Sequence, residues 1–366
     1  MMQLPKHDQL DTIHLQRLFD NMSECYKLFW FQAIVEEVYS GKTRLTFEEL
    51  IDNMIADAWY MVTEYRLNLG PADNLEDLVH YAQGLFGLKS SEKKASVLSA
   101  VRNSEDRDLQ RRKQILTYNV PYRLQAPFME DLKGKAWDGP KTDLGNRINS
   151  YSGLLYRFES ISGLQSIIVV DDNWSKYITT NYEIIMGWIQ FNLIQYLQRR
   201  NPSVPGIPNK LAPPQERNLE KVKKYWRAVL NVNPLHDIYG DVLLDPSGIS
   251  IDHFIPWSYV AHDELWNLHP TTKSINSSKS NSLPDWEKYF SRLCRTEYAA
   301  YETMWKNEAV HQAFDRCAKE HINSTDVMHR LYRQGLSAES FASVLEEIIL
   351  PVYNAATNLG FSRWSL

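Results

Sequence analysis

A cluster of prolines a little past the midpoint limits how this chain can fold. Pro202, Pro205, Pro208, Pro213 and Pro214 fall within 13 residues, out of 16 prolines in the 366-residue chain. Proline fixes φ and has no N–H to donate, so neither a helix interior nor a central strand can run through such a segment. We therefore predict an extended linker over 201–218, after a first domain over 1–200.

The first 200 residues have the patterns of a mainly helical domain. Thr46 and Glu49 form a capping box, and apolar residues recur at helical spacing beyond them. Further helices are predicted over 15–38, 90–104 and 182–198, and one short buried strand over 165–170. No motif in these 200 residues indicates a particular ligand. The role of this domain is therefore open, and it could sense a signal or bind a protein partner.

Charge and cysteine content limit how this protein could bind nucleic acid and where in the cell it is expected. The net charge is 40 − 45 = −5, so any nucleic-acid binding must use a local patch. The stretch 210–227 holds six basic residues against two acidic ones, which predicts a phosphate-facing helix or, alternatively, a solvated helix face. Three scattered cysteines form no CxxC pair, and no segment is apolar enough to span a membrane. We expect a cytoplasmic protein that does not bind membranes.

The segment 237–284 combines short strand patterns with a helix pattern. Residues 242–244 and 249–251 are strand-like, and the Asp-Pro-Ser-Gly sequence between them is typical of a turn. We therefore predict a β-hairpin that ends at Asp252 and His253. A short helix is expected to begin near Thr271 or Thr272 and to end before Pro284.

The polar residues on this frame have a definite spacing. Asn267 lies 14 residues after His253, Asn276 nine further on, and Lys279 one helical turn beyond Asn276. The sequences Ile251-Asp-His-Phe-Ile-Pro-Trp-Ser258, Trp266-Asn-Leu268 and 276–281 resemble the HNH nuclease superfamily, and especially the HNH domain of CRISPR RNA-guided effector nucleases. The resemblance covers 237–284, with asparagine, Asn276, as the third letter of the motif. The zinc-binding cysteines of other members are missing.

The resemblance implies a ββα-metal fold for this segment. The predicted fold class is therefore mainly α, with a helical N-terminal region, an HNH domain over 219–284 that includes the basic helix, and a helical region over 285–366 packing on it. In that last region helices are predicted over 286–305 and 337–350, the latter interrupted by Pro351.

The chemistry of phosphodiester hydrolysis suggests a role for each motif residue. His253 can deprotonate water near neutral pH, so it is the predicted general base. Asp252 and Asn276 supply oxygen ligands that suit Mg²⁺, with Mn²⁺ as a substitute. Asn267 is expected to hold the loop after His253 through backbone hydrogen bonds. Lys279 is predicted to contact phosphate or the transition state, the alternative being a solvent-exposed helix lysine.

Other polar and aromatic residues near the motif are assigned structural roles. His236, His262 and His269 are interpreted as surface residues or as neighbours of the site. Trp257 and Trp266 are assigned to the core rather than to base stacking, and Asp263-Glu264 to a polar loop rather than to metal binding.

The sequence thus predicts an Mg²⁺-dependent endonuclease, most simply acting on DNA, and by family analogy a bacterial phage-defence nuclease. Two alternatives are an RNA-cleaving HNH enzyme and a nucleic-acid-binding or scaffold protein with an inactive HNH domain. RNA cleavage stays open because a ββα site mainly contacts the phosphate backbone.

Overall fold

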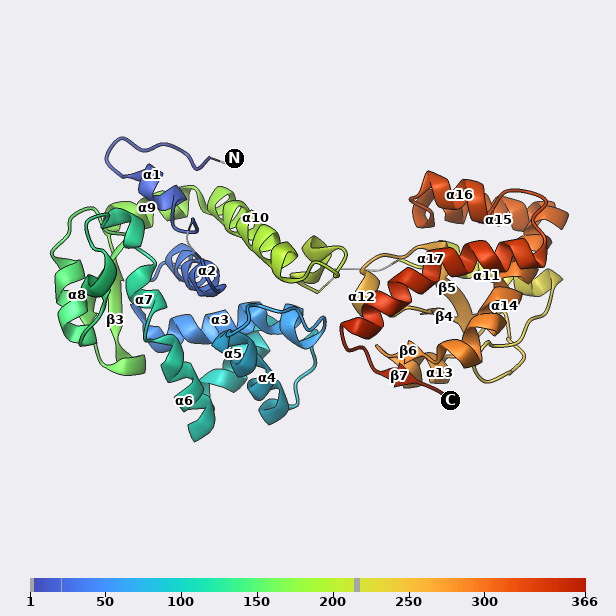
Figure 1. Cartoon of the computed structure of the whole chain (residues 1–366), viewed down its shortest axis with the longest axis horizontal. Coiled ribbons are helices and arrows are strands. Elements are labelled where there is room, and N and C mark those ends of the chain that lie inside the picture. Colours follow the sequence, from blue (N-terminus) through green and yellow to red (C-terminus); the bar gives the residue numbers. More distant parts are fainter. Residues whose placement is uncertain (1–2, 21, 214–217) are drawn as a thin grey trace. The chain divides into compact units, whose positions relative to one another are not determined.

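The computed structural model describes residues 3–20, 22–213 and 218–366. The chain forms two compact units, Met1–Pro202 with Lys210–Pro213, and Ser203–Asn209 with Pro214–Leu366 (Figure 1). The division falls inside the proline-rich segment. Of that segment, and of the basic stretch beside it, Pro214, Glu216 and Arg217 lie outside the described residues. Among the described residues no helix is long and apolar enough to cross a membrane.

The first unit is mainly helical with one small antiparallel sheet of strand order β1-β3-β2. Its α-helices are α1 (Thr12–Gln16), α2 (Tyr26–Tyr39), α3 (Phe47–Thr63), α4 (Asn74–Phe86), α5 (Lys94–Arg102), α6 (Arg107–Leu116), α7 (Val120–Arg123), α8 (Lys141–Asn149), α9 (Asp172–Thr180) and α10 (Tyr182–Arg200). Its strands are β1 (Arg44–Thr46), β2 (Tyr156–Ser160) and β3 (Ile167–Val170). Short 3₁₀ helices are η1 (Ala126–Phe128), η2 (Gly134–Trp137) and η3 (Gly163–Gln165), and η4 (Ile207–Lys210) follows α10.

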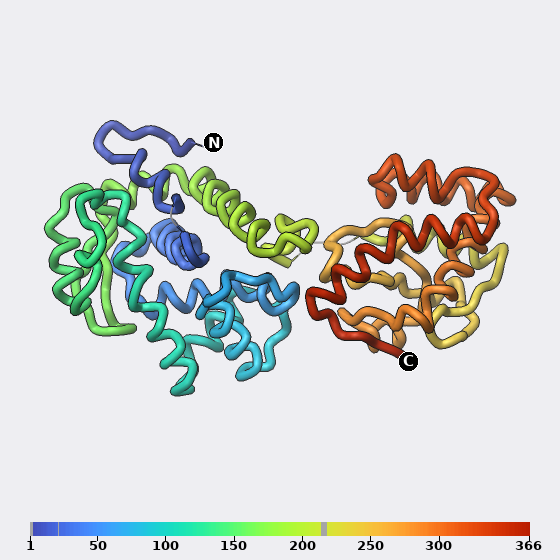
Figure 2. Tube along the Cα trace, in the orientation of Figure 1, coloured from blue at the N-terminus to red at the C-terminus, as the bar shows by residue number. Residues whose placement is uncertain are grey.

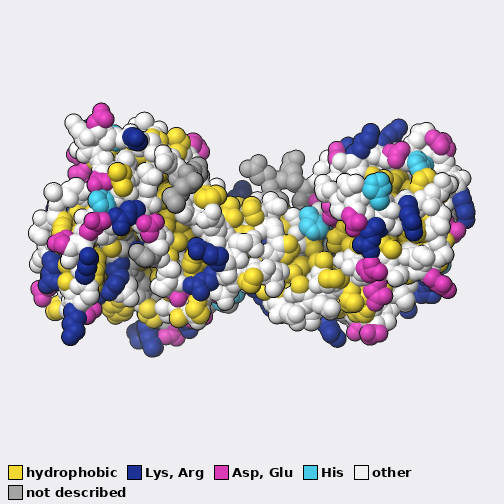
Figure 3. Space-filling model, turned by 45° about the horizontal axis from the view of Figure 1, so that its top comes forward, with side chains coloured by type: hydrophobic (Ala, Val, Ile, Leu, Met, Phe, Trp, Pro, Cys, Tyr) yellow, Lys and Arg dark blue, Asp and Glu magenta, His cyan; other side chains and the backbone are white. Residues whose placement is uncertain are grey.

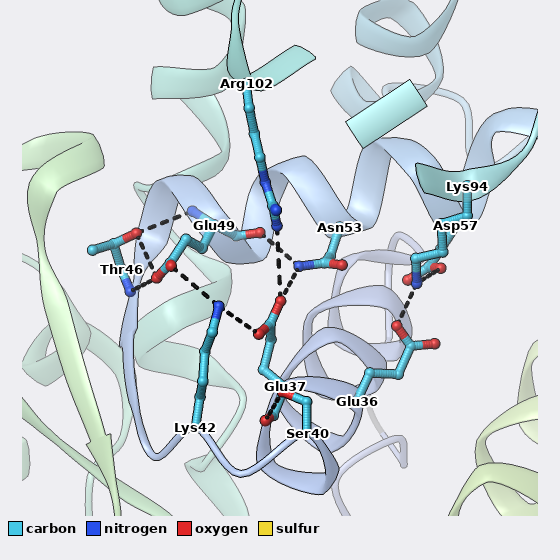
Figure 4. Close-up of polar contacts among 10 residues, drawn as sticks. All are labelled: Glu36, Glu37, Ser40, Lys42, Thr46, Glu49, Asn53, Asp57, Lys94 and Arg102. Carbon is cyan, nitrogen blue, oxygen red and sulfur yellow. Dashed lines mark hydrogen bonds and ion pairs between the residues drawn. The ribbon is translucent and has the colours of Figure 1, made fainter. Parts of the chain in front are cut away.

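Helix α3 begins at the predicted capping box, which is confirmed. The Thr46 side chain accepts from the Glu49 backbone, and the Glu49 carboxylate accepts from the Thr46 backbone (Figure 4). Further along α3 the Lys94 ammonium, from α5, bonds the carboxylates of Glu36 and Asp57. These ion pairs link α2, α3 and α5, and burial raises the pKa of Asp57 to about 7.

The helix predicted over 15–38 is two helices, which is a correction. α1 ends at Gln16 and α2 begins at Tyr26. Asp20 and Ser23 lie between them, and such short polar side chains compete with the helix for backbone hydrogen bonds. The strand predicted over 165–170 and the helix over 182–198 are present as β3 and α10.

The second unit holds two small two-stranded sheets among its helices. Figure 2 traces the course of its chain to the C-terminus. Its elements are α11 (Glu220–Val232), β4 (Ser250–His253), α12 (Trp257–Val260), η5 (Leu265–Asn267), β5 (Leu268–Thr271), α13 (Lys273–Lys279), β6 (Leu283–Pro284), α14 (Trp286–Lys306), α15 (Glu308–His321), α16 (Thr325–Leu331), α17 (Ala338–Asn358) and β7 (Arg363–Trp364). The whole chain is thus mainly helical with one small ββα domain, as predicted.

One hydrophobic core runs through this unit. Helix α11 contributes Val222, Tyr225, Trp226, Val229 and Leu230, whose spacing puts all five on one face. The same core includes residues of α14, α15 and α17. The C-terminal helices are therefore part of the fold that supports the ββα segment.

The hairpin predicted over 242–251 is wrong in its pairing. Strand β4 pairs instead with β5, on the far side of the loop 254–267. Val242 and Leu243 are about half exposed, whereas all four residues of β5 are buried, so pairing with β5 removes more surface from water. The predicted turn is present, with the Gly248 N–H bonding the Asp245 carbonyl at 3.0 Å.

Pro351 does not interrupt its helix, which is a third correction. Helix α17 continues from Ala338 to Asn358 with Pro351 inside it. One side of the helix is anchored by the buried residues Ile349 and Tyr353, and the Tyr353 hydroxyl donates to the Pro284 carbonyl at 2.8 Å. Tertiary packing on both sides of the proline compensates for the missing backbone bond.

Candidate active site

The end of strand β4 carries the Asp-His pair. The antiparallel register places Asp252 opposite His269 and His253 opposite Leu268. The indole N–H of Trp226 donates to the Leu268 carbonyl at 2.9 Å, so α11 fixes the partner strand. Because neighbouring strand residues point to opposite faces, Asp252 and His253 have different surroundings.

The Asp252 carboxylate is buried among hydrogen-bond donors. It accepts from the Tyr239 hydroxyl at 2.8 Å, and the Lys279 ammonium lies 3.2 and 3.1 Å from its two oxygens. Burial, with Asp252 as a second cause, raises the pKa of Tyr239 well above its ordinary value, so this phenol stays a neutral donor. The sequence does not predict this contact. Nothing in the segment Asp237-Ile-Tyr239 indicates that the Tyr239 hydroxyl bonds Asp252.

Lys279 is fully buried rather than exposed on its helix. Its ammonium also donates to the His253 carbonyl at 2.7 Å. Burial lowers the pKa of Lys279, and the neighbouring Asp252 opposes that shift. The structure therefore places this lysine on the backbone and carboxylate of β4, where it neutralises Asp252.

Asn276 lies one turn before Lys279 and also bonds β4. Helix α13 begins at Thr272, one of the two predicted N-caps, whose side chain accepts from the Ile275 backbone. The Asn276 amide nitrogen donates to the Ser250 hydroxyl at 2.8 Å and to the Ile251 carbonyl at 2.9 Å. These bonds hold the side chain against the strand by its nitrogen, which directs the amide oxygen away from those two acceptors.

The loop after His253 is closed by Asn267. Its amide oxygen accepts from the Ile255 N–H at 2.7 Å, and its amide nitrogen donates to the Ile255 carbonyl at 2.9 Å. The Phe254 N–H donates to the Asn267 carbonyl at 2.9 Å. Asn267 is fully buried, and its contacts are those of a residue that fixes the loop.

His253 meets a carboxylate that the sequence pattern assigned to a polar loop. Its Nε2 lies 2.7 Å from Asp263 Oδ1, and its side chain is 7% exposed. An ionised carboxylate only accepts hydrogen bonds, so Nε2 carries the proton in this pair. The segment between His253 and Asp263, which includes helix α12, gives no sequence signal of this contact.

His269 is buried on the other side of Asp252. Its Nε2 lies 3.6 Å from Asp252 Oδ2, and neither ring nitrogen has a hydrogen-bond partner among the described residues. Burial lowers the pKa of His269 to about 4, so the ring is neutral at physiological pH. The structure therefore makes this histidine a buried neighbour of the site. Trp266 is buried in the same core, and Trp257 is partly exposed.

The two predicted metal ligands lie along β4: Asn276 bonds Ser250 and Ile251 at the start of the strand, and Asp252 lies near its end. Asp252 offers carboxylate oxygens and Asn276 an amide oxygen, both of the type that Mg²⁺ prefers. No group of three or more His, Cys, Asp and Glu side chains in the described part of the chain could hold a metal. The Lys279 ammonium occupies the Asp252 carboxylate in this structure, so a cation that bound this carboxylate would have to displace the ammonium.

An antiparallel strand pair followed by a helix, with Asp and His at the strand end, defines the ββα-metal class of nuclease folds. Comparison with protein families agrees, because residues 236–285 match the family described as HNH endonuclease. This segment is an HNH domain. No curated protein and no solved structure matches the chain.

Proposed function

We propose that this protein is a metal-dependent endonuclease that hydrolyses phosphodiester bonds in DNA. The observation that carries the proposal is the placement of His253, with its carboxylate partner, directly after an oxygen ligand on the strand of an HNH domain. The HNH match supports nuclease chemistry. DNA as the substrate, Mg²⁺ as the metal and a role in phage defence are extensions drawn from resemblance to the family.

In this proposal His253 is the general base. A histidine accepts a proton from water near neutral pH, and the water then attacks the phosphorus. Asp252 and Asn276 would hold Mg²⁺, or Mn²⁺ in its place. When bound, such a cation stabilises charge on the phosphate and on the leaving oxygen. Asn267 keeps the loop that follows His253 in place through its two bonds to Ile255.

Lys279 neutralises Asp252 in this structure instead of contacting phosphate in solvent. Its buried ammonium bonds Asp252 and the His253 carbonyl, so it neutralises the carboxylate while no cation is bound. Displacement from Asp252 would free the ammonium to face the phosphate. Both functions keep Lys279 in the catalytic machinery.

Nucleic acid requires a local basic surface. On the face drawn in Figure 3, basic and acidic side chains are interspersed, in keeping with the net charge of −5. On α11, Lys224 is exposed, while Lys221 and Lys223 are paired with Glu320 and Glu220 at the surface. Surface pairs of this kind contribute little energy, so phosphate can replace the carboxylates.

The test is cleavage of four substrates by the full chain. Supercoiled plasmid, linear duplex, single-stranded DNA and RNA are incubated with Mg²⁺ and with EDTA, and His253→Ala serves as the control. We expect cleavage of DNA with Mg²⁺ only, and cleavage by the variant that is about a hundred- to ten-thousand-fold slower. Cleavage of RNA alone would reassign the substrate, and binding without any cleavage would favour an inactive HNH scaffold.

The first unit is proposed to bind the protein partner or signal that controls cleavage. Its own helical fold and separate packing support an independent task. The phage-defence role is supported by the resemblance to defence nucleases that carry HNH domains, and a plaque assay in cells that express the wild type or His253→Ala tests it.

A further inference from the structure

We propose that Asp263 is a positioning residue for His253, and that helix α15 holds it in place. The proposal rests on the function proposed above and adds to the HNH site a carboxylate and an anchor from the C-terminal helices. His321 and Asn323, the anchoring residues, lie outside the segment 236–285 that matches the HNH family.

The contact between Asp263 and His253 defines which ring nitrogen acts. Since Nε2 carries the proton and donates to Asp263 at 2.7 Å, the lone pair of the neutral ring is on Nδ1. Water then gives its proton to Nδ1 as its oxygen bonds to phosphorus, and the bond from phosphorus to the leaving oxygen breaks. Asp263 stays ionised throughout and stabilises the imidazolium that forms.

The burial of the pair makes it more than a surface ion pair. The His253 side chain is 7% exposed and the Asp263 side chain 21%. In such surroundings a charge-assisted hydrogen bond is stronger than in water, and it restricts the rotation of the ring. A carboxylate that orients a histidine is the same arrangement by which metal-binding and catalytic histidines are fixed in other proteins.

Helix α15 fixes the backbone that carries Asp263. The His321 Nδ1, at the end of α15, lies 2.8 Å from the Asp263 carbonyl oxygen and donates to it. The next residue, Glu264, accepts from Asn323, with its Oε1 at 3.1 Å from the backbone nitrogen and 2.6 Å from the side-chain nitrogen. His321 and Glu264 are both buried, so these bonds are shielded from solvent.

A backbone bond adds a further contact at Glu264. The Asn267 N–H donates to the Glu264 carbonyl at 3.0 Å. The backbone is therefore fixed at Asp263 by α15 and directly after it by the Asn267 turn. This arrangement presents the Asp263 carboxylate to His253 without the freedom of an ordinary surface aspartate.

The test compares Asp263→Asn and Asp263→Glu with the wild type in the full chain. Asn keeps the size but removes the charge, and we expect kcat to fall about 10- to 100-fold with KM and Mg²⁺ affinity nearly unchanged. Asp263→Glu should recover part of the loss. The matched control is Asp326→Asn, a change of the same kind at a side chain that is 70% exposed on α16.

A second readout follows the histidine ring itself. Long-range ¹H–¹⁵N correlation on histidine-labelled protein reports which ring nitrogen carries the proton. The wild type should show His253 protonated on Nε2, and Asp263→Asn should show a mixture of the two forms, which a merely structural role for the loop would not produce. Asn323→Ala should lower kcat in the same direction but by less.

The outcomes separate the two proposals. If the wild type cleaves, and Asp263→Asn keeps both its rate and the Nε2-protonated form, the positioning role is wrong while the nuclease function stands. If the wild type cleaves nothing with Mg²⁺, the nuclease function fails, and the ring readout still decides whether Asp263 orients His253. An Asn323→Ala variant with wild-type kcat would show that the bonds from Asn323 to Glu264, just after α15, do not support Asp263.

Discussion

At the scale of single residues, Lys279 and Asp252 form a buried ion pair at the proposed cation site. Both side chains are buried, and breaking such a pair by removing one partner costs about 3–5 kcal/mol. Lys279→Met should therefore lower the free energy of unfolding by about that amount in EDTA. Mg²⁺ should restore part of the loss, because the variant leaves Asp252 free to take the cation.

Urea unfolding with EDTA and with Mg²⁺ measures both effects. Lys306→Met, a change at a side chain that is 72% exposed on α14, is the control and should change neither. Equal stability of Lys279→Met and the wild type in EDTA would show that Lys279 does not neutralise Asp252.

A buried carboxyl in α14 makes the stability of the folded protein depend on pH. Burial raises the pKa of Glu297 well above its ordinary 4.5. Between 4.5 and the raised pKa the folded protein holds a proton that the unfolded chain has lost, so stability falls as pH rises through that window, by about 1.4 kcal/mol per pH unit at most. Glu297→Gln removes this loss.

We therefore expect Glu297→Gln to match the wild type near pH 4.5 and to become progressively more stable than it at higher pH. Free energies of unfolding at a series of pH values test this, with Glu302→Gln, a partly exposed position on the same helix, as control. Parallel curves for Glu297→Gln and the wild type would contradict the raised pKa.

At the scale of elements, α11 is the proposed phosphate-binding helix. Changing Lys221, Lys223 and Lys224 together to Glu should weaken DNA binding and reduce the salt dependence of the binding constant. The slope of log K against log salt should fall by about 0.9 for each lysine that contacts a phosphate. Filter binding or anisotropy at several salt concentrations measures it.

The control for this change is Lys89, Lys133 and Lys135 to Glu, which alters the net charge equally at exposed positions of the first unit. If the α11 variant binds as the wild type does, the helix is a solvated face, which is the alternative that the basic stretch leaves open.

Elements with local signals could be predicted from the sequence, and those that depend on distant partners could not. The capping box at Thr46 and the helix α13 with its cap at Thr272 depend on neighbours within one turn. The pairing of β4 with β5 depends on burial across a long loop, and β5 contains Pro270, which masks its strand character.

The motif residues show the same limit. The spacing of the motif identified Asp252, His253 and Asn276 through the HNH resemblance. It carried no information on Tyr239 or Asp263, because their contacts arise from the path of loops. Lys279 was placed on the right helix face, but its burial against Asp252 depends on how α13 packs on β4.

At the scale of the whole molecule, the site depends on helices far from it in sequence. Residues of α11, α14, α15 and α17 share one core with the strands of the HNH domain. The motif segment alone therefore lacks most of the surface that buries its strands. The first unit is compact by itself.

The proposed nuclease activity depends on His253 as the general base and on Asp252 as a metal ligand. The most direct measurement is the cleavage rate against Mg²⁺ concentration, with calorimetric Mg²⁺ affinity, for His253→Ala and Asp252→Asn. Asn is chosen at 252 because it keeps an acceptor for Tyr239 and Lys279.

His253→Ala should cleave about a hundred- to ten-thousand-fold more slowly and bind Mg²⁺ as the wild type does. Asp252→Asn should bind Mg²⁺ weakly and recover part of its activity at high Mg²⁺ or with Mn²⁺. If His253→Ala instead loses Mg²⁺ affinity as severely as Asp252→Asn, His253 is a metal ligand and its role as the general base is wrong.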